Sequence, residues 1–117
     1  MNLNKAKQVC RKLPGATEDI KWGADLVFSV GGKMFAVMGA DASADGISFK
    51  VDDDRFLELT DRPGIIPAPY LARVKWVRIE DLKAVGDAEA AEMLKRSYEL
   101  VFSKLTKKLQ REIEGAA

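Results

Sequence analysis

Apolar and polar positions follow a helical period at both ends of the chain and a strand period in its middle. Residues 4–13 repeat apolar groups at the spacing of an amphipathic helix, at Ala6, Val9, Cys10 and Leu13. Asn4 is a candidate N-cap, and Pro14-Gly15 ends the pattern. We therefore expect an N-terminal helix, which carries its cations on the polar side, at Lys5, Lys7, Arg11 and Lys12.

The next apolar segments predict an antiparallel hairpin and a third strand. "LVFSV" and "KMFAVM" flank Gly31-Gly32, and two glycines supply the positive φ values of a tight hairpin turn. Residues 26–38 are therefore predicted as a hairpin. "ADASADG" is predicted as a loop, and "ISFKV" alternates with Ile47, Phe49 and Val51 on one face and Ser48 and Lys50 on the other.

The second half of the chain adds two helices and a fourth strand. The aspartates of "DDDRFLELT" favour the N-cap and first turn of a short helix, and the prolines of "DRPGIIPAP" favour an irregular connection. "VKWVRI" at residues 74–79 is predicted as a strand. From Asp87, as N-cap, one long closing helix is predicted, with apolar residues at Ala91, Leu94, Tyr98, Val101, Leu105 and Leu109. Its last turns carry cations that complement the negative end of the helix dipole, at Lys104, Lys107, Lys108 and Arg111.

This order of elements predicts a single α+β domain over residues 1–117, with an antiparallel sheet of four to five strands and helices on one face. No segment has the length of a membrane span or a secretion signal, so we expect a cytoplasmic protein without membrane contact. The single cysteine, Cys10, is predicted to be a core residue rather than a reactive thiol.

The composition narrows the possible chemistry. The chain has no histidine, which removes the commonest general base and every Ser/His or Cys/His arrangement. Asp41 and Asp45 are too sparse for a Ca²⁺ loop, and adjacent Glu18 and Asp19 are interpreted as solubilising loop residues. We therefore assign no catalytic residue, metal ligand or cofactor. The chain has 19 Lys and Arg against 18 Asp and Glu, and this net charge of +1 does not predict a polyanionic partner. Such a partner can be inferred only from where the charges lie along the chain.

Charge placement points to residues 63–79, which contain no acid. Strand alternation places Trp76 and Arg78 on one face, and Val77 and Ile79 on the other. If Val77 and Ile79 face the helices, Trp76 lies on the open side of the sheet with two cations, Arg78 and Lys50. Tyr70 and Arg73 would lie at its edge, and Lys75 at the start of the strand. Such side chains neutralise phosphates and stack on bases. The alternative is that Trp76 is a half-buried packing residue and the cations keep an exposed face soluble.

The chain resembles the MmcQ/YjbR family over nearly its whole length. The resemblance is carried by the order and spacing of Pro14-Gly15, Trp22, Gly32-Lys33, Phe35-Ala36, Ser48 to Lys50, Pro69-Tyr70 and Trp76-Val77. It implies a CyaY/frataxin-like fold and a "double wing" mode of DNA binding. The family's basic and aromatic positions fall on Lys33, Lys50, Tyr70, Arg73 and Trp76. Where many relatives carry histidine just before the tryptophan, this chain carries Lys75.

Three functions follow as hypotheses. The first is a non-enzymatic module that binds DNA weakly and in a salt-dependent way, through Lys33, Lys50, Tyr70, Arg73, Lys75, Trp76 and Arg78, with the hairpin tip as a wing. The second is a protein-interaction or homo-oligomerising module that uses Leu105, Leu109 and Ile113, although core packing of these residues and a monomer are expected. The third is frataxin-like metal handling, which the basic first helix disfavours.

Overall fold

The computed structural model describes residues 1–23, 25–39 and 46–116. Helix α1 (Leu3–Arg11) leads into β1 (Ala16–Lys21), β2 (Asp25–Val30) and β3 (Lys33–Gly39). Strand β4 (Ile47–Lys50), helix α2 (Asp53–Thr60), strand β5 (Ile65–Pro67), the 3-10 turn η1 (Ala72–Val74) and strand β6 (Trp76–Ile79) follow. A second 3-10 turn, η2 (Leu82–Ala84), precedes helices α3 (Asp87–Phe102) and α4 (Lys107–Ala116).

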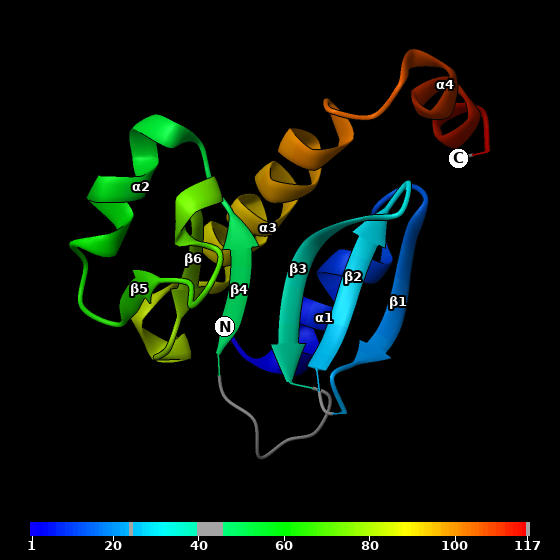
Figure 1. Cartoon of the computed structure of the whole chain (residues 1–117). Coiled ribbons are helices and arrows are strands. Elements are labelled where there is room, and N and C mark those ends of the chain that lie inside the picture. The colour runs from blue at the N-terminus through cyan, green and yellow to red at the C-terminus, as the bar shows by residue number, and fades with distance from the viewer. Residues whose placement is uncertain (24, 40–45, 117) are drawn as a thin grey trace.

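The strands form one antiparallel sheet with the order β1-β2-β3-β4-β6-β5. Helices α1 and α3 lie behind the sheet in Figure 1, and α2 lies beside β5 and β6. The predicted α+β class and the 26–38 hairpin are confirmed, with six strands in place of the expected four to five. The face of the sheet turned away from α1 and α3 is called the open face below.

Strand alternation separates a core row of side chains from an open-face row. Phe28, Ala36, Phe49 and Val77 are cross-strand neighbours, and all belong to the hydrophobic core. Ala6 and Cys10 of α1 and Leu94 of α3 pack into the same core. The next row along the strands runs through Val27, Val37, Ser48 and Arg78. The predicted core positions Ile47, Phe49 and Val51 are confirmed.

Two strands escaped the sequence analysis because they lack a strand period. In β1 the stretch after Ala16 is exposed along its length, so no alternation marks it, and Glu18 and Asp19 are strand residues rather than loop residues. Glu18 accepts two hydrogen bonds from the Arg11 guanidinium, at 2.7 and 2.9 Å, which joins α1 to β1. Strand β5 has only three residues and ends at Pro67, within the segment predicted as irregular.

The helix boundaries also differ from the prediction. Asn2 rather than Asn4 is the N-cap of α1, where its side chain accepts a hydrogen bond from the Lys5 backbone N–H at 2.8 Å. Gly86 rather than Asp87 is the N-cap of α3.

Burial raises the pKa of the Cys10 thiol to about 12, in agreement with its expected role as a core residue.

The predicted long closing helix is broken into α3 and α4. Thr106 Oγ1 accepts the backbone N–H of Leu109 at 3.2 Å at the start of α4. The Gln110 amide donates to the carbonyl of Phe102, the last residue of α3, at 3.2 Å, and to that of Leu105, in the connection to α4, at 3.0 Å. Lys107 and Lys108 therefore lie in the first turn of α4, and their predicted role at the negative end of a helix dipole is wrong.

Helix α4 and Leu105, which lies just before it, pack against the turns at the edge of the sheet. A methyl group added at Gly31 would come within 2.7 Å of Leu105 and 2.9 Å of Leu109, and one at Gly15 within 2.7 Å of Ile113. The apolar stripe at Leu105, Leu109 and Ile113 is thus used inside the molecule. Among the described residues, no helix combines the length and apolar character that a membrane crossing requires.

Candidate functional site

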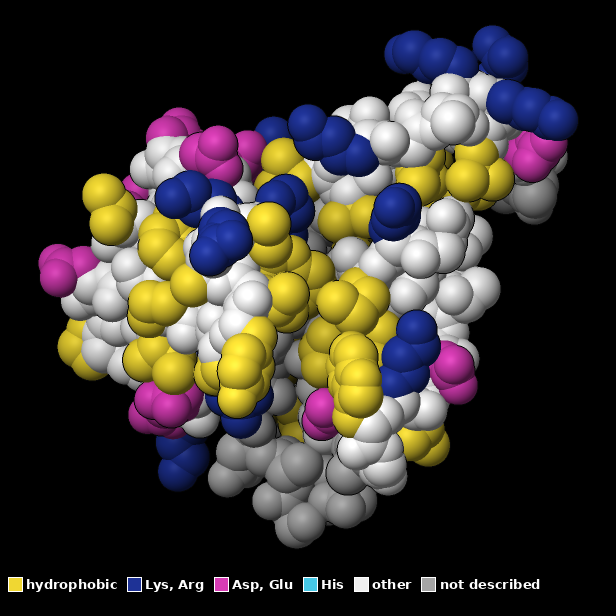
Figure 2. All heavy atoms as spheres, viewed as in Figure 1, with side chains coloured by type: hydrophobic (Ala, Val, Ile, Leu, Met, Phe, Trp, Pro, Cys, Tyr) yellow, Lys and Arg dark blue, Asp and Glu magenta, His cyan; other side chains and the backbone are white. Residues whose placement is uncertain are grey.

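A groove of about 490 Å³ lies on the open face, and we call it the open-face groove. It is lined by Trp22, Asp25, Met34, Val37, Ser48, Pro69, Tyr70, Leu71 and Arg78. Residues of β3, β4 and β6 supply its floor, and the connections after β1 and β5 supply its walls. Figure 2 shows hydrophobic side chains gathered on either side of a hollow in the lower middle of this face.

One wall is Trp22, which begins the connection from β1 to β2. Its side chain is 69% exposed, although tryptophan is among the most hydrophobic residues. Its backbone has φ 53°, in the left-handed region, and Gly23 follows with φ 85°. Bulky residues rarely adopt this conformation, which costs roughly 1–2 kcal/mol relative to the right-handed region.

The other wall is Tyr70, in the connection from β5 to β6. The Leu71 backbone N–H donates to the Ala68 carbonyl at 3.2 Å, which closes a four-residue turn with Pro69 and Tyr70 at its centre. Tyr70 has φ 65°, at a turn position that normally carries glycine. Its side chain is fully exposed. Two large aromatic residues therefore stand in solvent, in unfavourable backbone conformations, on the walls of one groove.

The structure corrects the central sequence expectation about Trp76. The predicted alternation of strand residues is confirmed, because Val77 and Ile79 belong to the hydrophobic core cluster and Trp76 lies outside it. The side chain is nevertheless only 4% exposed, so it does not stand on an open surface. The chain from β5 returns beside it: Trp76 N–H donates to the Leu71 carbonyl, and its own carbonyl accepts from Ala68 N–H. The alternative interpretation, a packing role for Trp76, fits this burial.

Two of the predicted cations are engaged near Trp76. The Lys50 ammonium donates to the Val74 carbonyl at 2.6 Å, and Lys50 is the cross-strand partner of Trp76. Lys75 precedes the strand instead of opening it, with φ 65°, and its ammonium lies 5.0 Å from the centre of the Phe56 ring. Both residues are partly buried.

The remaining predicted residues occupy different places. Arg78 and Tyr70 line the open-face groove, and Arg73 is exposed on η1 beside the Tyr70 wall. Arg78 extends over the start of β4, where a methyl at Gly46 would come within 2.6 Å of its guanidinium. Lys33 is exposed at the tip of the β2–β3 hairpin, which also contacts α4 and is therefore not a free wing.

Sequence reasoning missed most of the groove. The sequence indicates Trp22 only as part of the family pattern, and it does not predict Asp25, Met34 or Val37 as site residues. The available signal was local: "KWG" places a tryptophan directly before a glycine, and "PAPY" places a tyrosine where a proline turn usually has glycine. Ser48 was predicted to lie on the open face, and it lines the groove floor as a buried residue.

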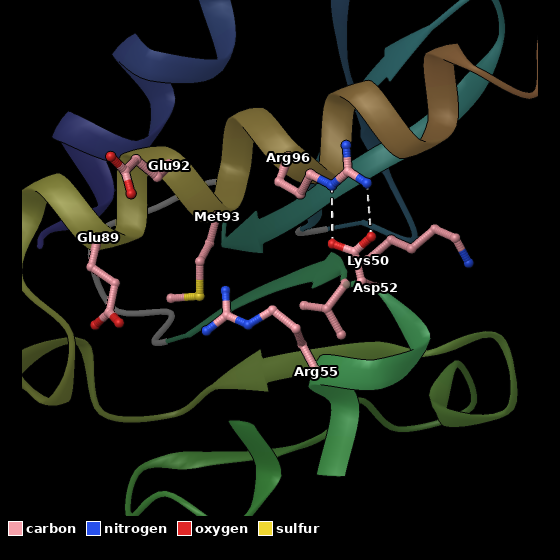
Figure 3. Close-up of a pocket in the computed structure, with 8 residues that line it drawn as sticks. Lys50, Asp52, Arg55, Glu89, Glu92, Met93 and Arg96 are labelled. Atoms are coloured by element: carbon pink, nitrogen blue, oxygen red, sulfur yellow. Dashed lines mark hydrogen bonds and ion pairs between the residues drawn. The ribbon is translucent and has the colours of Figure 1, made fainter. Parts of the chain in front are cut away.

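A second groove, of about 420 Å³, lies between α2 and α3 (Figure 3). Lys50, Arg55 and Arg96 line it together with Asp52, Glu89 and Glu92, so its cations and acids are equal in number. Arg96 donates two hydrogen bonds to Asp52, at 2.8 and 3.0 Å, and this guanidinium lowers the pKa of the Asp52 carboxyl. Arg62 binds Glu89 in the same way and lowers its pKa. Asp52 is the N-cap of α2 and Arg62 follows its C-terminal end, so these ion pairs join both ends of α2 to α3. The described lining of this groove therefore offers a charged ligand no excess of either sign.

No three His, Cys, Asp or Glu side chains come together at metal-binding distances in the part of the chain that the structure describes. Asp41 and Asp45, which the sequence analysis considered for Ca²⁺, lie outside the described residues.

The fold and groove define a small α+β domain with an antiparallel sheet covered by helices on one face and hollowed on the other. The YjbR family model matches residues 11–100, and the chain belongs to that family. It is similar to the crystal structure of Deinococcus radiodurans protein DR2400, a DUF419 domain, with 30% identity, a TM-score of 0.86, and 97% of this chain and 88% of that one covered.

A Pseudomonas syringae protein of solved structure shares the fold, with 20% identity, a TM-score of 0.72, and 86% of this chain and 99% of that one covered. A comparison with curated proteins found no match.

Proposed function

We propose that this YjbR domain is a non-enzymatic nucleic-acid-binding module whose contact surface is the open-face groove and its cationic border. The observation that carries the proposal is the pair of exposed aromatic walls, Trp22 and Tyr70, each with a cation close by in the chain. Lys21 precedes Trp22, and Arg73 follows Tyr70 on η1. A surface that binds single strands has two parts: cations along the path of the phosphate backbone, and aromatic rings on which the bases stack.

The charge distribution on this face supports the proposal. Lys and Arg side chains lie above the hollow and on α4 in Figure 2. Asp25 is the only acid among the described lining residues of the groove. A net charge of +1 is small, so the binding is expected to be weak and to depend on local charge rather than on the whole protein. The family resemblance also implies DNA binding by a CyaY-like fold in a "double wing" mode. Such a mode would need a wing other than the β2–β3 hairpin tip, which contacts Leu105 and Leu109.

The competing functions have less support. Self-association through Leu105, Leu109 and Ile113 lacks a free surface, because these residues pack against Gly15, Gly31 and the core. Metal handling would require a ligand cluster, and the polar side of α1 is basic instead. We therefore keep nucleic-acid binding as the proposed function.

Fluorescence anisotropy with labelled single-stranded and duplex DNA tests this function. If Lys21 and Arg73 each meet one phosphate of a single strand, binding weakens roughly sevenfold between about 50 and about 200 mM salt. Arg73→Glu is expected to weaken binding at low salt. Lys95→Glu, on the exposed side of α3, makes the same change in net charge and is expected to leave the affinity nearly unchanged. Absence of binding at low salt, or equal effects of the two substitutions, contradicts the proposal.

A further inference from the structure

The open-face groove combines features that a phosphate backbone alone does not require. Its two aromatic walls, Trp22 and Tyr70, come from different connections and lie 48 residues apart in the sequence. Both side chains are exposed. Its volume of about 490 Å³ lies within the range of small-molecule sites, roughly 300–1,000 Å³. The hollow is therefore large enough for a ring system to enter.

The backbone conformation of the two walls indicates that their side chains matter. Glycine adopts positive φ without cost, whereas tryptophan and tyrosine do not. The described part of the chain has only three non-glycine residues with positive φ, Trp22, Tyr70 and Lys75, and two of them are the walls of this groove. Neither wall residue gains much burial in return, since both are exposed. Such backbone strain is typical of functional sites.

The lining defines the chemistry of the occupant. Apolar and aromatic groups form the walls, at Trp22, Pro69, Tyr70 and Leu71, and Met34 and Val37 form part of the floor. Polar groups are few: the Arg78 guanidinium, the Asp25 carboxylate and the Ser48 hydroxyl. This combination fits a flat ring that is apolar on its faces and polar at its edges, as a nucleobase is.

We propose that the open-face groove takes an unpaired nucleobase, stacked against Trp22 and Tyr70, from a single-stranded or locally opened nucleic acid. This inference rests on the proposed function and specifies the form of its ligand. In a duplex the faces of the bases are covered by their neighbours, so a base enters the groove only after it leaves the stack. Lys21 and Arg73 then meet phosphates on either side of the bound nucleotide.

The test compares three ligands that separate base contacts from phosphate contacts. They are a single-stranded oligothymidylate, an abasic oligonucleotide with the same number of phosphates, and free thymidine monophosphate. Base–aromatic stacking contributes roughly 1–3 kcal/mol per base, so the oligothymidylate is expected to bind about 5- to 150-fold more tightly than the abasic strand. The free nucleotide is expected to bind more weakly than the strand, because it lacks the neighbouring phosphates.

The variants are chosen so that folding is preserved. Tyr70→Gly and Trp22→Gly place glycine at positive φ, where it is favoured, and each is expected to lower the affinity for the oligothymidylate towards that for the abasic strand. Tyr70→Phe keeps the ring and is expected to retain the preference. Leu57→Ala removes an exposed apolar side chain on α2 and serves as the control.

The outcomes separate this inference from the proposed function. Salt-dependent binding with equal affinity for the abasic strand, or a preference that survives both glycine substitutions, overturns the base site and leaves nucleic-acid binding standing. Free nucleotide that binds as tightly as the strand also overturns it, in favour of a small-molecule site. Absence of binding by every strand removes the proposed function itself.

Discussion

At the scale of single residues, one buried hydroxyl holds α3 against the middle of the sheet. Ser97 is fully buried, donates to the Phe35 carbonyl at 2.6 Å and accepts the Lys50 backbone N–H at 2.9 Å. Phe35 lies where the β2–β3 register shifts, and Lys50 is the last residue of β4. The serine therefore satisfies backbone groups that the strand ladders leave without partners.

Ser97→Ala is expected to lower the free energy of unfolding by about 1–3 kcal/mol, because it leaves a buried donor and a buried acceptor unsatisfied. Urea denaturation measures the change. Ser103→Ala is the matched control: its hydroxyl is exposed and donates to the Leu100 carbonyl at 2.7 Å, so the loss is expected to stay within about 0.5 kcal/mol. Equal losses in the two variants would contradict the bridging role of Ser97.

At the scale of elements, the β2–β3 turn and α4 depend on each other. Gly31 and Gly32 both have positive φ, at 57° and 80°, so an alanine at either position is strained. They differ in surroundings, because a methyl at Gly31 meets Leu105 and Leu109, whereas one at Gly32 meets nothing within 4 Å. At the tip of the hairpin, only Gly31 therefore packs against Leu105 and Leu109, and Gly32 does not.

Gly31→Ala is expected to destabilise the protein more than Gly32→Ala. Strain of roughly 1–2 kcal/mol applies to both, and displacement of the leucines adds to it only at Gly31. Thermal or urea unfolding of the two variants gives the comparison. A larger loss at Gly32 would show that α4 does not rest on this turn.

The contact between α1 and α3 predicts a pH effect. The Lys5 ammonium, 2.6 Å away, and the amino group of Met1 lower the pKa of Asp87 from 3.8 to about 2. A carboxyl whose pKa is lower in the folded protein contributes stability above its unfolded pKa, and loses it as the pH falls towards the folded value. Acidification from pH 3.8 to about 2 is therefore expected to destabilise the wild type more than Asp87→Asn. Parallel pH profiles of the two unfolding midpoints would contradict this.

Helices and strands with a clear hydrophobic period could be predicted from the sequence. Elements and breaks that depend on tertiary contacts could not. The 26–38 hairpin has both alternation and a glycine turn, and it was predicted correctly. Strand β1 has an exposed polar pattern and is held by its pairing with β2, a contact that no local pattern reveals. The break between α3 and α4 was missed because apolar spacing continues through Leu105 and Leu109.

At the scale of the whole molecule, the site combines loops that are distant in the chain. Alternation correctly placed Trp76 and Arg78 on the face away from the core. Residues 68–71 return beside β6 and hydrogen-bond to the Trp76 backbone, and the Trp76 side chain is buried rather than open to solvent. The same segment places Tyr70 in solvent, across the groove from Trp22 in the connection between β1 and β2. Tyr70, Arg73 and Arg78 could be proposed from residues 63–79 alone, whereas the pairing of Tyr70 with Trp22 depends on the strand order.

The two tryptophans allow the most direct measurement of the central claim, that nucleic acid binds at the open-face groove. A ¹H–¹⁵N correlation spectrum, recorded while single-stranded DNA is added at low salt, reports the indole N–H of exposed Trp22 and of buried Trp76 separately. We predict that the Trp22 indole signal and the amides of Tyr70 and Arg73 move in a saturable way, while the Trp76 indole signal stays in place. Shifts confined to the lysines of α4 or to the groove between α2 and α3, with an unchanged Trp22 signal, would contradict the account.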